Sequence, residues 1–123
     1  MKNFTFDELV DTWIEYYQYD SNSKEAEERF WALETYMDWT IDEKHEELWR
    51  FTLEVLKREP SPELMNILAA GPLEDLMQDY GPLYIDRVEK EARTHVKFRK
   101  LLAGVWKADI KDDIWKRMQK FLR

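Results

Sequence analysis

Residues 5–17 read Thr-Phe-Asp-Glu-Leu-Val-Asp-Thr-Trp-Ile-Glu-Tyr-Tyr, and their spacing sets the pattern that the rest of the chain follows. The apolar side chains recur at the i, i+3, i+4, i+7 positions of one helix face. Thr5 is followed three residues later by Glu8, which is the signature of a capping box at a helix N-terminus. The stretch therefore predicts an amphipathic α-helix that begins directly after Thr5.

The same helical spacing continues through the remainder of residues 1–60. After a turn at residues 19–23 we expect a second helix. Its predicted inward residues are Ala26, Phe30, Leu33 and Met37. Thr40 and Glu43 repeat the capping-box pattern, so we expect a third helix to open there. The predicted inward residues of this third helix are His45, Leu48, Trp49, Thr52, Val55 and Leu56.

Proline and glycine punctuate the second half of the chain. Ser61 followed by Pro62 predicts an N-cap and a first helical position. Each of the two steps Gly71-Pro72 and Gly81-Pro82 is expected to end one helix and start the next. A longer helix should follow the second step. Its predicted inward residues are Tyr84, Ile85, Val88, Ala92 and His95.

The whole pattern predicts an all-α fold. No segment shows the period-2 alternation of a half-buried strand, and we expect seven or eight mostly short helices. A compact bundle and a short stack of helical hairpins both fit this pattern. We expect a single domain over residues 1–123, with an acidic, aromatic-rich subregion at 1–60 and a Gly-Pro punctuated subregion at 61–123.

Five short segments of the second half carry a resemblance to a known family. They are residues 68–76 (Leu-Ala-Ala-Gly-Pro-Leu-Glu-Asp-Leu), 85–89 (Ile-Asp-Arg-Val-Glu), 98–102 (Phe-Arg-Lys-Leu-Leu), 104–106 (Gly-Val-Trp) and 113–115 (Asp-Ile-Trp). Together they resemble a family of small bacterial all-helical domains of unknown function, over about residues 64–119. The resemblance implies the fold and a bacterial source. It implies no reaction and no catalytic residues, because none is established for the family.

The composition excludes several classes of protein. The chain has no cysteine, which excludes a disulfide framework and a thiolate nucleophile and fits a reducing cytoplasm. It has no run of about 18 apolar residues and no apolar signal core at its start, so we expect a cytoplasmic protein without a membrane span. Its three glycines leave no phosphate-binding loop, and we expect no cofactor.

Metal-binding and catalytic motifs are weak. Asp42 with His45 and Glu91 with His95 are the two carboxylate–histidine pairs at helical spacing. A two-metal bundle site needs two Glu-x-x-His pairs and two further carboxylates, so we expect no metal site. The serines lack the Gly-x-Ser-x-Gly motif of an activated nucleophile. We therefore expect a protein that is not an enzyme, with a pocket of carboxylates and tyrosines assembled by the fold as the alternative.

The charge pattern is the sharpest feature. Residues 1–84 carry 20 acidic and 7 basic side chains, whereas residues 85–123 carry 6 acidic and 12 basic, and the net charge is -7. Like charges four residues apart destabilise a helix, so we expect basic groups from outside the first helix to offset the charges of its acidic face. The residues of this acidic face are Asp7, Glu8, Asp11 and Glu15.

Two sources of that positive charge remain open. The internal source is a basic stripe on the chain itself, consisting of Arg93, Lys97 and Lys100. The external source is the basic surface of a partner protein. We do not expect the stripe to bind nucleic acid, because the acidic molecule as a whole would repel a polyanion.

Aromatic residues are concentrated in the first half, where 12 of the 18 lie. Tyr16, Trp31 and Tyr36 fall off the predicted core stripes. Tyr and Trp dominate binding hot spots, so these three are candidate partner-binding residues, with helix packing inside the domain as the alternative.

These observations favour a non-catalytic protein-binding module. Its most concrete form is an acidic antagonist or immunity-like protein that masks a basic partner, because complementary charge speeds association and fixes orientation. The alternatives are a small enzyme with a carboxylate and tyrosine pocket, and a structural domain that self-associates through its acidic face and basic stripe.

Overall fold

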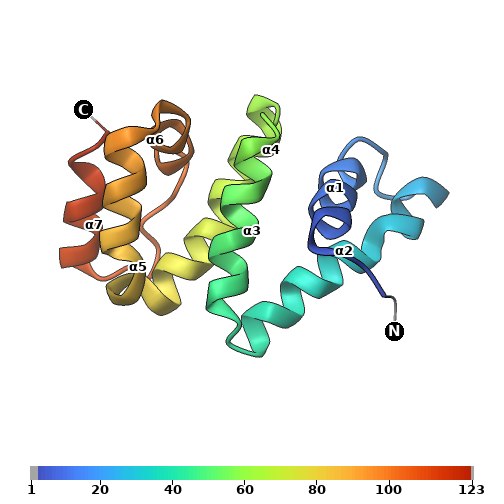
Figure 1. The fold of residues 1–123 in the computed structure, drawn as a ribbon, viewed down its shortest axis with the longest axis horizontal. Helices are drawn as coiled ribbons and strands as arrows, with labels where there is room; N and C mark the ends of the chain where they lie inside the picture. The colour runs from blue at the N-terminus through green and yellow to red at the C-terminus, as the bar shows by residue number, and fades with distance from the viewer. Residues whose placement is uncertain (1–2, 123) are drawn as a thin grey trace. The chain divides into compact units, whose positions relative to one another are not determined.

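The computed structural model describes residues 3–122, and every regular element among them is helical (Figure 1). The all-α prediction is thus confirmed. The elements are α1 (Phe6–Tyr16), α2 (Lys24–Ile41), α3 (His45–Lys57), α4 (Pro62–Leu68), the π-helix η1 (Ala69–Leu73), α5 (Glu74–Thr94), α6 (Val96–Leu102) and α7 (Asp112–Gln119).

Two predicted helix starts are confirmed in atomic detail. At α1 the Glu8 N–H donates to Thr5 Oγ1 at 3.1 Å, and the Thr5 N–H donates to Glu8 Oε1 at 3.0 Å. At α4 the Leu64 N–H donates to Ser61 Oγ at 3.2 Å, with Pro62 in the first turn. Both caps satisfy backbone donors that a helix N-terminus leaves free.

Fewer separate helices are present than the seven or eight expected. α4, η1 and α5 follow one another without an intervening residue, so residues 3–122 hold six separate helical segments. At Gly71-Pro72 the chain widens into the π-helix instead of stopping. At Gly81-Pro82 it stays helical and kinks, with Tyr80 at a φ of -134° and a ψ of 20°.

The chain stays helical through both Gly-Pro steps because neither glycine ends a helix. A glycine stop uses positive φ, and none of the glycines among residues 3–122 adopts it. Proline then removes one backbone donor and bends or widens the helix locally. Gly81 has a packing role, since a Cβ there would lie 3.1 Å from Ile114 Cγ2 of α7.

The contacts divide the chain into two compact units, the first ending at Pro60 and the second beginning at Ser61. The boundary coincides with the change in composition at residue 60. Unit 1 contains α1, α2 and α3, and unit 2 contains the remaining elements. Whether the two units behave as the single domain expected stays a prediction.

The core of unit 1 forms where α1 packs against α2 and α3. Leu9, Val10 and Trp13 of α1 are buried there. The Trp13 ring meets Phe51 of α3 edge to face, with ring centroids 5.2 Å apart and an interplanar angle of 88°. Burial of such large aromatic rings is a main source of stability in a core this small.

α2 turns a different face inward from the one predicted. Ala26 and Ala32 are fully buried, whereas Phe30 is 39% and Met37 is 42% exposed. Leu33 is half-buried. The inward positions predicted for Phe30 and Met37 are therefore wrong. The physical reason is that small alanines allow the backbones of packed helices to approach closely, which larger side chains would prevent.

The third helix does not begin at the capping box predicted for Thr40 and Glu43. α2 runs on through Thr40, whose hydroxyl donates to the Met37 carbonyl at 2.6 Å. Glu43 has a φ of 59°, and the Lys44 N–H donates to the Trp39 carbonyl at 2.9 Å. This six-to-one bond with a left-handed residue is a Schellman C-cap, so the two residues end α2 instead of opening α3.

The left-handed backbone at Glu43 generates a stability prediction. The variant Glu43→Gly should raise the free energy of unfolding by about 1 kcal/mol, because glycine adopts this conformation without the steric cost that Cβ imposes. Asp42→Gly is the matched control, since it removes the same charge at a φ of -87° and should destabilise. Urea denaturation of the three proteins measures both effects, and equal stability of the two variants would contradict the argument.

In unit 2, α5 packs against α6 and α7, and a buried carboxylate joins two of these helices. Glu89 of α5 is buried, and Arg117 of α7 donates to both of its carboxylate oxygens, at 3.0 Å from Nε and 2.6 Å from Nη2. Arg117 Nη2 also donates to Asp86 at 2.6 Å. The hydrogen bonds from Arg117 lower the pKa of Glu89 below its ordinary value, against the opposing effect of burial.

The lowered pKa of Glu89 predicts how stability depends on pH. The ionised carboxylate contributes stability that is fully present above its unfolded pKa of about 4.3 and is lost as the pH falls through the lower folded value. Glu89→Gln should therefore cost about 1–3 kcal/mol at pH 7 and show less loss between about pH 5 and pH 3. Glu63→Gln, at an exposed position of α4, is the control. Parallel pH profiles for wild type and Glu89→Gln would overturn the assignment.

Candidate functional site

The acidic face of α1 finds its positive charge inside unit 1. Arg58, which follows the last residue of α3, donates from Nε to Asp11 at 2.7 Å and from Nη2 to Asp7 at 3.1 Å. Partial burial of Arg58 opposes its charge, yet the hydrogen bonds to Asp11 and Asp7 raise its pKa. Arg58 also pairs with Glu54, at 3.4 Å. One guanidinium therefore offsets the like charges that stand four residues apart on α1.

The two remaining acids of that face are also engaged. Glu15 accepts a hydrogen bond from Arg29 Nε at 3.1 Å, and this bond is the first cause of the raised pKa of Arg29. The Arg29 guanidinium also lies over the Tyr19 ring, 4.7 Å from its centroid. Glu8 serves the capping box of α1. The internal source of charge is thus Arg58 and Arg29, not the basic stripe proposed for this role.

The basic stripe does not form one helix face. Arg93 lies near the end of α5, whereas Lys97 and Lys100 belong to α6. Between them His95 is extended, with a φ of -130° and a ψ of 112°, and ends the helical run. This break also explains why the inward position expected for His95 is wrong. Its side chain is 61% exposed, and its Nδ1 lies 3.4 Å from Glu91 Oε1.

The three off-stripe aromatic residues occupy different places. Tyr36 stacks on the core residue Phe51, with centroids 6.4 Å apart, so it packs within unit 1. The rings of Trp31 and Phe4 pack together, with their centroids 4.9 Å apart. The centroid of the Tyr16 ring lies 5.1 Å from that of Tyr17 and 6.1 Å from that of Phe30. Tyr16 and Trp31 both line one surface hollow, which Tyr36 does not line.

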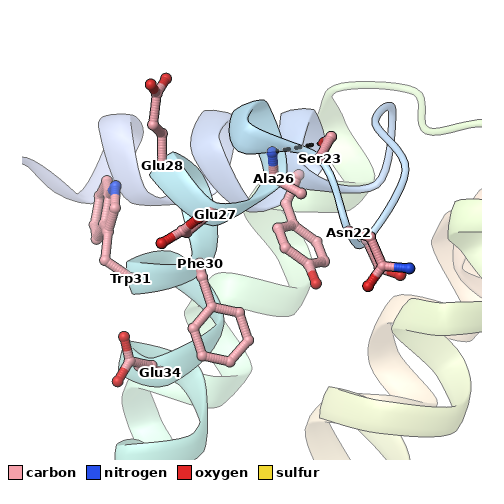
Figure 2. Close-up of a pocket in the computed structure, with 10 residues that line it drawn as sticks. Asn22, Ser23, Ala26, Glu27, Glu28, Phe30, Trp31 and Glu34 are labelled. Atoms are coloured by element: carbon pink, nitrogen blue, oxygen red, sulfur yellow. Dashed lines mark hydrogen bonds between the residues drawn. The ribbon is translucent and has the colours of Figure 1, made fainter.

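That hollow has a volume of about 560 Å³ and combines aromatic rings with carboxylates. We call it the acidic-aromatic hollow, and its defining residues are Tyr16, Glu27, Glu28, Phe30, Trp31 and Glu34. Figure 2 shows Glu27, Phe30, Trp31 and Glu34 projecting from α2, with the rings of Phe30 and Trp31 on different sides of the helix. The turn at residues 21–23 closes one end, where Ser23 Oγ accepts the Ala26 N–H at 3.1 Å.

The carboxylates of Glu27 and Glu34 distinguish this hollow from the acidic face of α1. Neither makes an ion pair with any residue that the structure describes, 3–122. Glu28 acts electrostatically on Arg29, which is committed to Glu15. A second, smaller hollow of about 270 Å³ shares Glu28 and Trp31 and includes Glu15. Aromatic faces beside free carboxylates suit the alkyl stem and cationic head of Lys or Arg.

Three of the predicted partner-binding residues lie in these hollows, and their role in binding stays a prediction. Tyr16, Trp31 and Glu15 line the two hollows, whereas Asp7 and Asp11 are held by Arg58. Glu27, Phe30 and Glu34 were missed because Phe30 was assigned to the core. The available signal was the i, i+3, i+7 spacing of these three residues, which places an aromatic ring between two acids on one helix face.

Among residues 3–122 no three His, Asp or Glu side chains are grouped as a metal site requires. None of the helices in that part of the chain is long and apolar enough to cross a bilayer.

Comparison with known proteins assigns the family. A family of unknown function, DUF6869, matches residues 19–123, so the chain belongs to this family. The match confirms the resemblance to a family of unknown function and extends it into the first half of the chain. No curated protein and no solved structure shows significant similarity to the chain.

The role of Arg58 generates a prediction about α1. Arg58→Met should lower the free energy of unfolding by about 1 kcal/mol, because Asp7 and Asp11 would repel each other without their shared cation. The same change in an Asp7→Asn, Asp11→Asn background should cost less, and a double-mutant cycle by urea denaturation measures the difference. Lys57→Met, which removes a neighbouring exposed cation, is the control. Equal costs in the two backgrounds would contradict the assigned pairing.

Proposed function

We propose that this member of the DUF6869 family is a non-catalytic protein-binding module whose acidic-aromatic hollow holds basic side chains of a partner protein. The observation that carries the proposal is the pair of carboxylates, Glu27 and Glu34, which have no cation among residues 3–122 and flank the partly exposed ring of Phe30. Charges left without a partner at an aromatic surface are the groups that a complementary cation stabilises most.

The site differs from the acidic face of α1 first expected. Arg58 and Arg29 already offset Asp7, Asp11 and Glu15, so a partner gains less from approaching α1. Tyr16 and Trp31 remain in the proposal because they line the hollow. Tyr and Trp supply large contact area at low entropic cost, which suits a binding surface.

The acidic composition supports one form of this function above the others. With a net charge of -7, the molecule attracts a basic surface from a distance and orients it before contact. An antagonist that masks a basic partner, such as the nucleic-acid-binding surface of a nuclease, uses both effects. A cytoplasmic location, predicted from the lack of cysteine, belongs to this proposal.

Affinity capture from an extract of the native host tests the proposal. The wild-type protein should retain a basic protein that Glu27→Lys, Glu34→Lys loses, and rising salt should weaken the wild-type interaction. Asp79→Lys, Asp109→Lys is the matched control, because it makes the same charge change at exposed sites of unit 2. Mass spectrometry identifies the retained proteins. Equal capture by all three proteins, or capture of the bait alone, would refute the role of the hollow.

A further inference from the structure

The acidic-aromatic hollow continues into a longer row of exposed residues on α2. The row steps alternately by three and four positions along the helix, which keeps its members on one face. Its members are Glu27, Phe30, Glu34, Met37 and Ile41. Four helical turns separate the first from the last, a length of about 21 Å.

The apolar members of this row are unusually exposed for their size. Phe30 is 39%, Met37 is 42% and Ile41 is 76% exposed. α1 and α3 pack on α2 where Ala26 and Ala32 are fully buried, and Tyr36 is stacked on Phe51. The row is thus the face of α2 that its neighbours within unit 1 leave open.

The row also has a definite charge. Glu27 precedes Phe30, Glu34 separates Phe30 from Met37, and Asp38 directly follows Met37 in the sequence. None of the three carboxylates has an ion pair with a residue in the described range 3–122. Arg29, one of two cations on α2, is bound to Glu15. A partner must therefore present apolar groups for the row and cations for the acids.

The spacing of the row identifies the shape of that partner. Anchors three and four residues apart match the grooves of a second α-helix. A β-strand would bind by pairing with the open edge of a sheet, and residues 3–122 contain no strand. We propose that an amphipathic helix of a partner protein, with an apolar stripe flanked by Lys or Arg, lies along α2 over Phe30, Met37 and Ile41. This proposal rests on the proposed function, because it names the partner element that fills the same site.

Charge excludes the other occupants of an exposed helical face. A parallel second copy of α2 would set Glu27 and Glu34 against identical carboxylates, which like-charge repulsion disfavours. An antiparallel copy would set Glu34 against its own copy and Glu27 against Ile41, which leaves both charges without a cation. Anionic lipid headgroups would be repelled by the same groups. The acids therefore select a cationic helix from among the surfaces that the apolar residues alone would accept.

Designed peptides test the shape of the partner on the full-length protein. The probe is a Leu/Lys peptide of about 18 residues with leucine at i, i+3, i+4, i+7, and titration calorimetry measures its affinity. One control peptide has the same composition with leucine and lysine alternating, and another replaces each lysine by glutamate. The helical Leu/Lys peptide should bind at least about tenfold more tightly than either control.

Variants locate the binding on α2. The double variant Met37→Glu, Ile41→Glu should lower the affinity for the helical peptide at least about tenfold. Leu83→Glu, Val96→Glu should leave it unchanged within about twofold, because these apolar residues are similarly exposed but belong to unit 2. Circular dichroism of both variants checks that the protein stays folded.

The outcomes separate this inference from the proposed function. Equal binding of the helical and alternating peptides would overturn the inference that the partner element is a helix. The proposal that the hollow binds basic side chains would remain. Loss of helical-peptide binding in the Leu83→Glu, Val96→Glu variant to the same extent would overturn the placement on α2. If no peptide binds while host capture still depends on Glu27 and Glu34, the inference fails and the proposed function stands. If host capture is also independent of these two residues, both fail.

Discussion

The close packing of α1 on α2 across two alanines is the constraint on which unit 1 depends. Ala26 and Ala32 carry nothing beyond Cβ, so the rotation of α2 that buries them brings the helix backbones together. At about 100° per residue, Phe30 and Met37 lie about 160° and about 140° around the helix from Ala32, and beside Ala26 at the edge of the packed face. The exposed positions of Phe30 and Met37 are therefore consequences of this one rotation.

The balance of charge in residues 1–60 explains why free carboxylates occur at all. This part of the chain has 16 acidic and 7 basic side chains, so most acids have no cation available. Geometry decides which acids are satisfied. Arg58 reaches two acids of α1 at once, and Arg29 reaches Glu15. Glu27 and Glu34 lie on the other side of α2 from these contacts, and their free charge gives the surface its selectivity.

Two of the three helix caps predicted from local sequence were correct, and the third, at Thr40 and Glu43, was wrong because these residues end α2. The choice of helix face was also harder to predict. The caps at Thr5 and Ser61 depend on a few adjacent residues, and both were correct. The Gly-Pro steps were misjudged because whether they stop a helix depends on packing, as the contact of Gly81 with Ile114 illustrates. The face of α2 was misjudged because large apolar residues were assumed to lie inward, whereas tight helix packing required alanine. The same error hid Phe30 from the candidate site, although Tyr16 and Trp31 were identified.

The apolar and acidic residues of this helix face have opposite effects on association. Exposed apolar area favours association with any apolar surface, whereas free carboxylates disfavour association with every surface that brings no cation. Apolar contact supplies the affinity of an interface, whereas charge mainly decides which partner is accepted. A row of Phe30, Met37 and Ile41 alone would pair with its own copy or with other apolar surfaces. Glu34 lies between Phe30 and Met37, and Glu27 precedes Phe30, so such pairing leaves carboxylates without a cation. A cationic helix would cover the apolar residues and neutralise the free charge.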